Sequence, residues 1–303
     1  MNTPPWDAAV LARIASLELR ARRAVEGVLH GHHGSVRTTS ALEFADYKEY
    51  APGDPIKDLD WRVMGRSDRL VIRRHRAEAE LATTLVLDAS GDGATGRGGA
   101  HPRGRPPLDG TRWGSAVVFC AALAWWLERH QEPVGLLVLG GDDVRWSWLP
   151  PATGRAQLVR VLGVLAGARP AGRTDLGAGL RSLGARLPRR SVAVLVSDLA
   201  QEPAEWGPAA ATLRARRADL RVVHLIDRAE WGLDFDRPLR FFSPEGGAPL
   251  PEDPAELRAA FVAERDAFFA EARGHLSAAE AGYVPFFTDT PVEQPLARVL
   301  AGG

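Results

Sequence analysis

Apolar positions near the start of the chain repeat at helical spacing. Leu11, Ile14 and Leu17 lie among arginines and glutamates, and Gly31 follows the pattern as a stop signal. This spacing predicts one amphipathic helix from about residue 8 to residue 29. From residue 31 to residue 69 the pattern becomes irregular and rich in Gly, Pro and Asp, which predicts loops with short strands.

After Leu81, short apolar runs alternate with longer segments of helical period. This alternation is typical of a parallel sheet covered by helices on both faces, so we predict an α/β fold over residues 81–303, preceded by a separate segment, residues 1–80. The predicted strands are 83–88, 134–139, 192–198, 221–227 and 283–288, and the predicted helices are 113–130, 155–165, 176–187, 208–217 and 255–276. The Gly, Pro and Arg-rich stretch 91–110 is predicted to be a mobile insertion and a potential lid.

The charge balance narrows the range of partners. Lys plus Arg equals Asp plus Glu at 38 each, so the chain carries no overall positive field that would attract nucleic acid or anionic lipid. Cys120 is the one cysteine, which excludes a disulfide framework and fits a reducing compartment. The longest apolar run, residues 116–127, is too short for a membrane span, and residues 1–19 do not resemble a signal peptide. We therefore expect a soluble, cytoplasmic protein.

Polar side chains gather where the predicted strands end. Ligands bind beyond the carboxyl ends of parallel strands, so residues at these positions are the first candidates for a site. The candidates are Asp88, Ser90 and Asp92 after the first strand, Thr174 before a helix, and Asp198 after a later strand. Carboxylate and hydroxyl oxygens suit a hard divalent cation, so we predict a Mg²⁺ site, with Mn²⁺ or Ca²⁺ as alternatives.

This set resembles the metal-ion-dependent adhesion site of von Willebrand factor A domains, an Asp-x-Ser-x-Ser turn with a distant Thr and a distant Asp. Asp92 departs from that pattern, which has serine there, and gives three carboxylates with a formal charge of about −3. The site either binds its metal without an incoming carboxylate or keeps the turn for structure only. A second interpretation is that Thr174 and Asp175 simply cap a helix.

A longer stretch resembles the DUF58 family. Residues 43–54 (EFADYKEYAPGD) are followed by Asp60-Trp61-Arg62 and Arg66, matching the hallmark E-F-x-x-x-R-x-Y-x-x-G-D and I-D-W except that Lys48 replaces arginine and Leu59 replaces isoleucine. The resemblance runs from about residue 31 to the end of the chain. It implies a three-layer, Rossmann-like von Willebrand factor A domain. It also implies that the protein binds a MoxR-type AAA+ ATPase, or a client of that ATPase, and takes part in chaperone-like maturation of other proteins.

Two interpretations of the hallmark stretch remain open. It forms either a scaffold, with Trp61 as a core anchor, or a docking face for the partner. The candidate docking residues are Tyr47, Tyr50, Asp54, Asp60, Trp61 and Arg66.

Sequence signals for catalysis are weak. The glycines after residue 91 match no phosphate-binding loop, and no G-x-S-x-G elbow accompanies Ser90 or Ser197. His30, His32 and His33 lack a carboxylate or cysteine at ligand spacing, so they make a poor transition-metal site. The sequence therefore favours a non-enzymatic interaction module. A metal-assisted phosphohydrolase that uses the same carboxylates is the alternative.

Overall fold

The computed structural model describes residues 8–31, 44–49, 71–75, 81–94, 111–140, 147–188, 190–233, 235, 239–241, 250–252 and 254–302. They belong to two compact units, one formed by residues 1–36 with 82–303 and the other by residues 37–81. The predicted segment 1–80 is thus divided, because its helix belongs to the larger unit.

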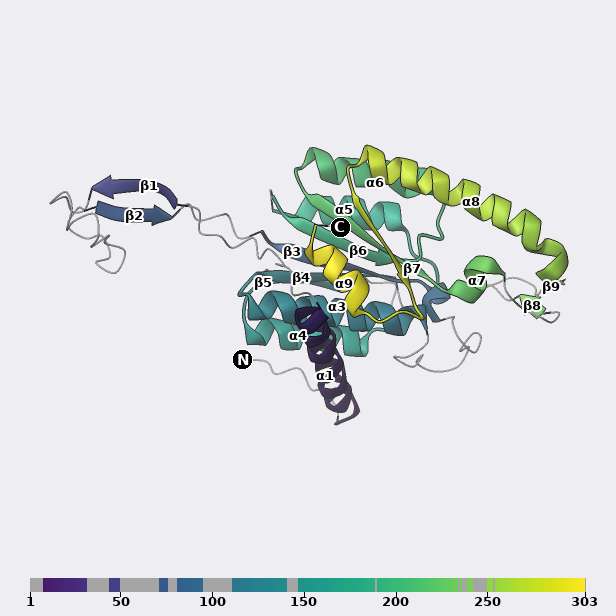
Figure 1. The fold of residues 1–303 in the computed structure, drawn as a ribbon, viewed down its shortest axis with the longest axis horizontal. Coiled ribbons are helices and arrows are strands. Elements are labelled where there is room, and N and C mark those ends of the chain that lie inside the picture. The colour runs from purple at the N-terminus through teal and green to yellow at the C-terminus, as the bar shows by residue number, and fades with distance from the viewer. Residues whose placement is uncertain are drawn as a thin grey trace. The chain divides into compact units, whose positions relative to one another are not determined.

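A six-stranded sheet forms the centre of the larger unit (Figure 1). Its order is β10-β7-β6-β3-β4-β5, with parallel pairing except at the edge, where β5 runs antiparallel to β4. The strands are β3 (Thr83–Ala89), β4 (Val134–Gly140), β5 (Ser147–Ala152), β6 (Val192–Ser197), β7 (Asp219–Ile226) and β10 (Gly282–Phe287). The chain winds outward from β3 in one direction and then returns to β6 on its other side, so the strand order reverses at β3. This reversal is where α/β sheets bind ligands.

Helices cover both faces of the sheet and complete three layers. Leu85 and Leu87 of β3 pack in the apolar cluster on one side and Val86 packs in the cluster on the other, because successive side chains of a strand point to opposite faces. The first face carries α3 (Arg112–Arg129), α4 (Arg155–Gly167) and α9 (Glu293–Leu300). The second carries α5 (Leu176–Arg186), α6 (Pro203–Ala215) and α8 (Pro254–Ala278). The predicted α/β fold with a mainly parallel sheet is confirmed.

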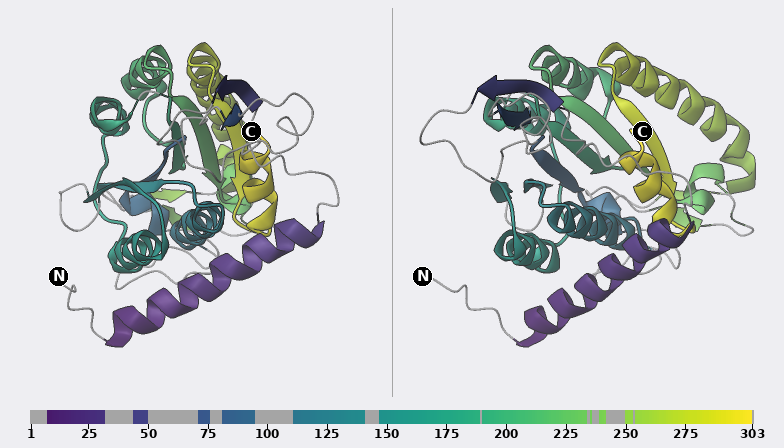
Figure 2. Two further views of the ribbon diagram at one scale, coloured as in Figure 1. Left: turned by 90° about the vertical axis from the view of Figure 1, so that its left-hand side faces the viewer. Right: turned by 60° about the vertical axis from the view of Figure 1, so that its left-hand side comes forward.

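Helix α1 (Ala8–Gly31) lies across α3, α4 and α9, as Figure 2 shows. Two residues of its predicted apolar stripe, Ile14 and Leu17, are buried and join the cluster that contains α3, whereas Leu11 is 51% exposed. Glu18 pairs with Arg155 of α4 on the outer side. The first helix therefore packs on the outer side of that helical layer (Figure 2).

The smaller unit contains an antiparallel pair, β1 (Phe44–Glu49) and β2 (Val71–His75). Tyr47 lies in β1 opposite Arg73. Short strands were predicted for residues 31–69, a range that contains β1 but ends before β2. The other candidate docking residues, Tyr50, Asp54, Asp60, Trp61 and Arg66, lie outside the described residues, as does most of the 91–110 insertion.

Several elements were not predicted. Strand β5 has the sequence SWLPPA, whose two prolines argue against a strand, but an edge position tolerates them. Helix α6 begins at Pro203, five residues before the predicted start, and contains Pro208. The short helices α7 (Arg228–Gly232) and α9 and the pair β8 (Leu239–Phe241) and β9 (Leu250–Glu252) were also missed. Cys120 of α3 and Trp206 of α6 are both fully buried.

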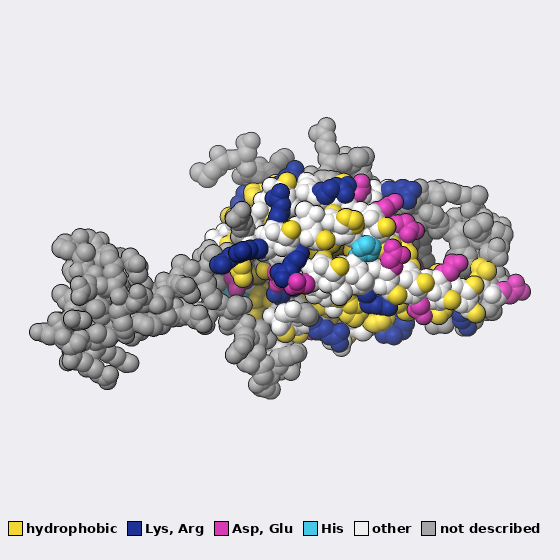
Figure 3. Space-filling view, turned by 90° about the horizontal axis from the view of Figure 1, so that it is seen from above, with side chains coloured by type: hydrophobic (Ala, Val, Ile, Leu, Met, Phe, Trp, Pro, Cys, Tyr) yellow, Lys and Arg dark blue, Asp and Glu magenta, His cyan; other side chains and the backbone are white. Residues whose placement is uncertain are grey.

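The described surface carries both positive and negative side chains (Figure 3), as expected from equal numbers of basic and acidic residues. On the face drawn in Figure 3, basic and acidic side chains occur among apolar and uncharged ones. None of the described helices combines the length and the apolar character that a membrane span requires.

Candidate functional site

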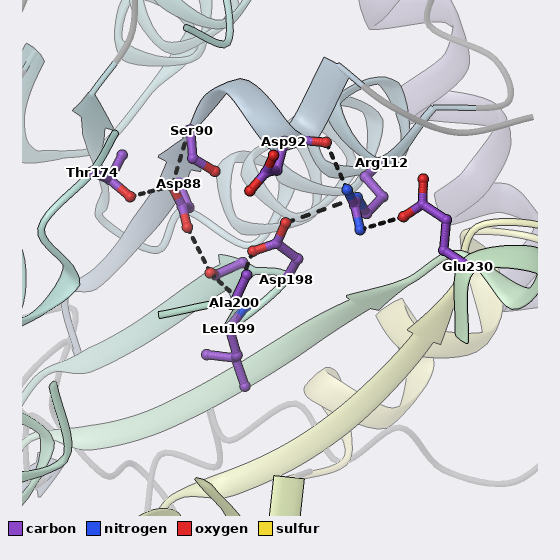
Figure 4. A network of polar contacts seen from close by, with 10 residues as sticks. Asp88, Ser90, Asp92, Arg112, Thr174, Asp198, Leu199, Ala200 and Glu230 are labelled. Carbon is purple, nitrogen blue, oxygen red and sulfur yellow. Dashed lines mark hydrogen bonds and ion pairs between the residues drawn. The ribbon is translucent and has the colours of Figure 1, made fainter. Parts of the chain in front are cut away.

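Asp88 is the centre of a polar network at the carboxyl end of β3 (Figure 4). Its Oδ1 accepts hydrogen bonds from the Ser90 backbone N–H and the Thr174 hydroxyl, each over 3.0 Å. Its Oδ2 accepts a hydrogen bond of 2.7 Å from the Ser197 hydroxyl. The Asp88 residue is 8% exposed. The predicted convergence of Asp88 and Thr174, which are 86 positions apart, is therefore present in the structure.

The loop that carries Thr174 is held against the end of β3 by its backbone. Ala171 N–H donates to Ala89 O over 3.0 Å, and Gly91 N–H donates to Gly172 O over 2.8 Å. Thr174 also needs a glycine at the end of β4, because a Cβ on Gly140, which has φ +78°, would lie 2.4 Å from the Thr174 methyl group. The close approach of β4 and this loop thus fixes the threonine.

Helix capping at this loop is carried by Asp175 and not by Thr174. The Asp175 side chain accepts a hydrogen bond of 2.7 Å from Ala178 N–H at the start of α5. The capping interpretation is therefore correct for Asp175, while the Thr174 hydroxyl is directed to Asp88.

Two polar residues in the network were not among the predicted site residues. The Ser197 hydroxyl, which donates to Asp88, also accepts from Leu199 N–H over 3.0 Å. Gln201 donates from Nε2 to the Thr174 hydroxyl over 2.7 Å, and its Oε1 accepts from Leu176 N–H over 2.9 Å. Gln201 therefore links the loop after β6 to the start of α5. Ser197 ends a strand and could have been included on that signal, whereas nothing in the sequence singles out Gln201.

Asp198 has one carboxylate oxygen satisfied and one not. Oδ1 accepts from Ala200 N–H over 3.2 Å, whereas Oδ2 is buried without a hydrogen-bond partner among the described residues. The next residue, Leu199, is fully buried and has φ 54°, in the left-handed region that costs a branched side chain about 1 kcal/mol or more. Backbone strain therefore lies directly beside a carboxylate whose Oδ2 accepts no hydrogen bond from the described residues.

Arg112, which sequence analysis left out, supplies a cation to this edge. It is the first residue of α3, after the N-cap Thr111. Its Nη2 donates to the backbone carbonyl of Asp92 over 2.8 Å, its Nη1 lies 2.8 Å from Glu230 Oε2, and its Nε lies 3.8 Å from Asp198 Oδ2. Figure 4 shows the guanidinium between Asp92, Asp198 and Glu230.

Burial and mutual repulsion raise the pKa values of the aspartates Asp88 and Asp92. Burial, and next the charge of Asp198, raise the pKa of Asp88 to about 6, although the hydrogen bonds from Ser197, Ser90 and Thr174 lower it. Asp88 is therefore ionised at pH 7 but holds its proton more tightly than an exposed aspartate.

The neighbouring groups show the same competition. Burial, followed by the charge of Asp198, raises the pKa of Asp92, while Arg112 and Arg173 lower it. Burial alone would lower the pKa of Arg112, but the acidic side chains around it, above all Asp198 and then Glu230, raise it above its usual value. Arg112 therefore carries its full charge at physiological pH.

A buried histidine lies behind Asp198. His224 Nδ1 lies 2.7 Å from the Tyr283 hydroxyl, and its ring is 4.7 Å from that of Phe269. Burial lowers the pKa of His224 to about 3, although a hydrogen bond with the backbone of Asp198 raises it. The neutral imidazole thus supports the Asp198 loop rather than exchanging protons near pH 7.

The residues fit a divalent cation in part. Asp88, Thr174 and Asp198 converge, and the unsatisfied Asp198 Oδ2 is the kind of atom that a cation or its water would complete. Among the described residues, however, no three acidic, histidine or cysteine side chains form a metal cluster by themselves. Binding would thus need the hydroxyls of Ser90 and Thr174 in addition to carboxylates.

The strand order with its antiparallel edge strand defines a doubly wound α/β domain, and acidic and hydroxyl side chains lie at its switch point. Residues 46–268 match the family described as "Protein of unknown function DUF58", and the chain belongs to that family.

The chain is also similar to curated proteins and to solved structures. The chain is 27% identical over 225 residues to the uncharacterized proteins Rv1480 of Mycobacterium tuberculosis and Mb1516 of Mycobacterium bovis, covering 73% of this chain and 67% of each relative. It is similar to BatB from Bacteroides thetaiotaomicron (12% identity, TM-score 0.47, 72% of this chain, 95% of that one). The von Willebrand factor A domain of SpRpn10 is also similar (11% identity, TM-score 0.44, 72% and 94%).

Proposed function

We propose that this protein is a non-catalytic interaction module that binds its partner at the carboxyl edge of the sheet, in a manner that depends on a divalent cation. The observation that carries the proposal is the convergence of Asp88, Thr174 and Asp198, together with the buried Asp198 Oδ2 that has no hydrogen-bond partner among the described residues. A buried acceptor without a donor costs about 1–3 kcal/mol, so it is retained where a ligand can satisfy it.

Mg²⁺ is the cation we propose. The residues that would hold it are Asp88, Ser90, Asp92, Thr174 and Asp198. When bound, Mg²⁺ would offer an open position to an oxygen atom of the partner. The chain itself positions these donors: β3 and β6 deliver the two aspartates, and Gln201 holds the Thr174 hydroxyl.

The partner we propose is a MoxR-type AAA+ ATPase, or a client protein of that ATPase, and the process is chaperone-like maturation in the cytoplasm. Membership of the DUF58 family supports this partner, and the lone cysteine supports a reducing compartment. Residues of the smaller unit, including Tyr47, offer a second docking face in this proposal.

Affinity capture tests the docking site directly. The tagged protein is incubated with its native lysate in Mg²⁺ or in EDTA, beside Asp198→Ala and a control, Asp219→Ala, at the far end of the sheet. Asp219 is exposed and pairs only with Arg221 among the described residues, so its loss leaves the site intact. We expect an AAA+ ATPase with the wild type and the control in Mg²⁺, and none in EDTA or with Asp198→Ala. Equal capture under all conditions would remove the sheet edge from the proposal.

A phosphoester hydrolysis assay addresses the enzymatic alternative. We expect no turnover by the wild type with Mg²⁺ present. Turnover that disappears in Asp88→Ala would replace the interaction module with a metal-assisted phosphohydrolase.

A further inference from the structure

Arg112 is a buried cation among acidic groups that come from several elements. Its side chain is 15% exposed, and Asp92, Asp198, Asp227 and Glu230 all act electrostatically on it. These groups follow β3, β6 and β7, so the guanidinium lies where the three strand ends meet. Its side chain forms an ion pair with the carboxylate of Asp198, one of the residues proposed to hold the metal.

The guanidinium of Arg112 and a divalent cation would compete for the same oxygen atom, Asp198 Oδ2. Arg112 Nε lies 3.8 Å from Asp198 Oδ2, the buried oxygen without a hydrogen-bond partner among the described residues. At this separation and an effective dielectric constant of about 20, unit charges interact by several kcal/mol, so a neighbouring guanidinium strongly disfavours a second cation.

We infer that Arg112 is the internal counter-cation of this edge and sets its affinity for divalent ions. The inference rests on the proposed metal site and names the residue that regulates it. Arg112 partly neutralises Asp198 when no metal is bound, which weakens metal binding. It also offsets part of the negative charge of the site: Asp88, Asp92, Asp198 and Glu230 count about −4, Arg112 makes this about −3, and a divalent ion then brings it to about −1.

Glu230 of α7 holds the guanidinium from its other side. Arg112 Nη1 lies 2.8 Å from Glu230 Oε2, which is closer than the approach of Nε to Asp198. Glu230 thus draws positive charge toward α7 and away from Asp198. If the charge of Glu230 is removed, the guanidinium is free to interact more strongly with Asp198. Loss of the Arg112 charge should therefore raise metal affinity, and loss of the Glu230 charge should lower it.

Calorimetric titration of the purified full-length protein with Mn²⁺, and separately with Mg²⁺, tests the inference. We expect Arg112→Gln to bind the ion at least about tenfold more tightly than the wild type, and Arg112→Lys to stay near the wild type because it keeps the charge. Glu230→Gln should bind roughly two- to fivefold more weakly. Arg173→Gln is the control for loss of an exposed positive charge beside Asp92, and it should change affinity by less than about twofold.

A thermal-shift measurement covers the case in which Arg112→Gln folds poorly. Loss of the buried cation should lower the melting temperature in EDTA, and Mn²⁺ should raise it by more than it raises that of the wild type. Equal affinities for Arg112→Gln and the wild type, or no binding by either, would overturn the inference. Affinity of Glu230→Gln at or above that of the wild type would overturn the role of Glu230.

These measurements distinguish failure of the Arg112 inference from failure of the proposed docking function. Binding of Mn²⁺ by Arg112→Gln but not by the wild type supports the counter-cation and removes metal from the wild-type docking mechanism. Metal-independent capture of the partner would likewise leave the role of Arg112 standing.

Discussion

The Ser197 hydroxyl donates a 2.7 Å hydrogen bond to Asp88 Oδ2 and thereby joins the ends of two neighbouring parallel strands, β6 and β3. Ser197 is 1% exposed, so water cannot replace the donor without rearrangement. Ser197→Ala should lower the free energy of unfolding by about 1–3 kcal/mol, because it leaves a buried charged acceptor short of one donor. Urea denaturation at pH 7 measures this.

Ser191→Ala is the matched control for Ser197→Ala. Ser191 is equally buried, but its hydroxyl donates to a neutral carbonyl, that of Pro188. Its loss should cost about 1 kcal/mol or less. A larger loss in Ser191→Ala than in Ser197→Ala would contradict the importance given to the Asp88 contact.

The raised pKa of Asp88 predicts a pH-dependent difference between the wild type and Asp88→Asn. Asp88 ionises near pH 4 in the unfolded chain and at about 6 in the fold, so the folded state binds more protons between these values. The contribution of Asp88 to stability is therefore greatest below pH 4 and is lost as the pH rises to 6. The wild type should lose up to roughly 3 kcal/mol relative to Asp88→Asn over this interval.

Denaturation of both proteins at pH 4, 5, 6 and 7 measures the difference. Other titrating groups occur in both proteins and largely cancel. A difference that stays constant, or that favours the wild type as the pH rises, would contradict the raised pKa.

His224 should act with the opposite sign. Its folded pKa, about 3, lies below the value near 6.5 of an unfolded chain, so the unfolded state binds the extra proton between these values. Stability from the neutral imidazole is complete above pH 6.5 and falls by about 1.4 kcal/mol per pH unit below it. His224→Gln should remove this slope. Parallel stability curves for the two proteins between pH 6.5 and 4 would contradict the buried neutral state.

The left-handed backbone at Leu199 predicts an unusual order of substitutions. Leu199→Ala and Leu199→Gly both remove a fully buried side chain, which costs about 2–5 kcal/mol. Glycine adopts φ 54° without a Cβ penalty, so Leu199→Gly should be more stable than Leu199→Ala by about 1 kcal/mol. Chemical denaturation of the pair measures this order. The usual order, with alanine more stable, would show that the strain at Leu199 is small.

The sequence predicted the part of the site that strand ends define. Asp88 and Asp198 directly follow apolar runs, and parallel strands bring such positions to one edge whatever lies between them. Arg112 could not be found in this way, because it opens a helix beyond a long insertion and its partners depend on where α3 and α7 begin. Gln201 lies in a loop and acts through a backbone N–H of α5, a contact that no residue pattern marks.

For the fold, too, the sequence predicted individual elements but not the contacts between them. Periodicity predicted α1, because Leu11, Ile14 and Leu17 follow a helical repeat, but it could not say that the buried members of this stripe pack with α3. Strand β5 was missed because its prolines contradict strand propensity, and only the antiparallel pairing with β4 explains its place.

The packing of α1 against both α3 and α9 also has a consequence for folding during translation, because the two contacts of α1 can form only at different times. Helix α1 leaves the ribosome early, with its leucine and valine stripe uncovered. Part of that stripe finds α3 after about a hundred residues, but α9 is made more than 260 positions later than the end of α1. The contact between α1 and α9 is thus a late event of high contact order, and the part of α1 that packs on α9 stays uncovered for most of translation.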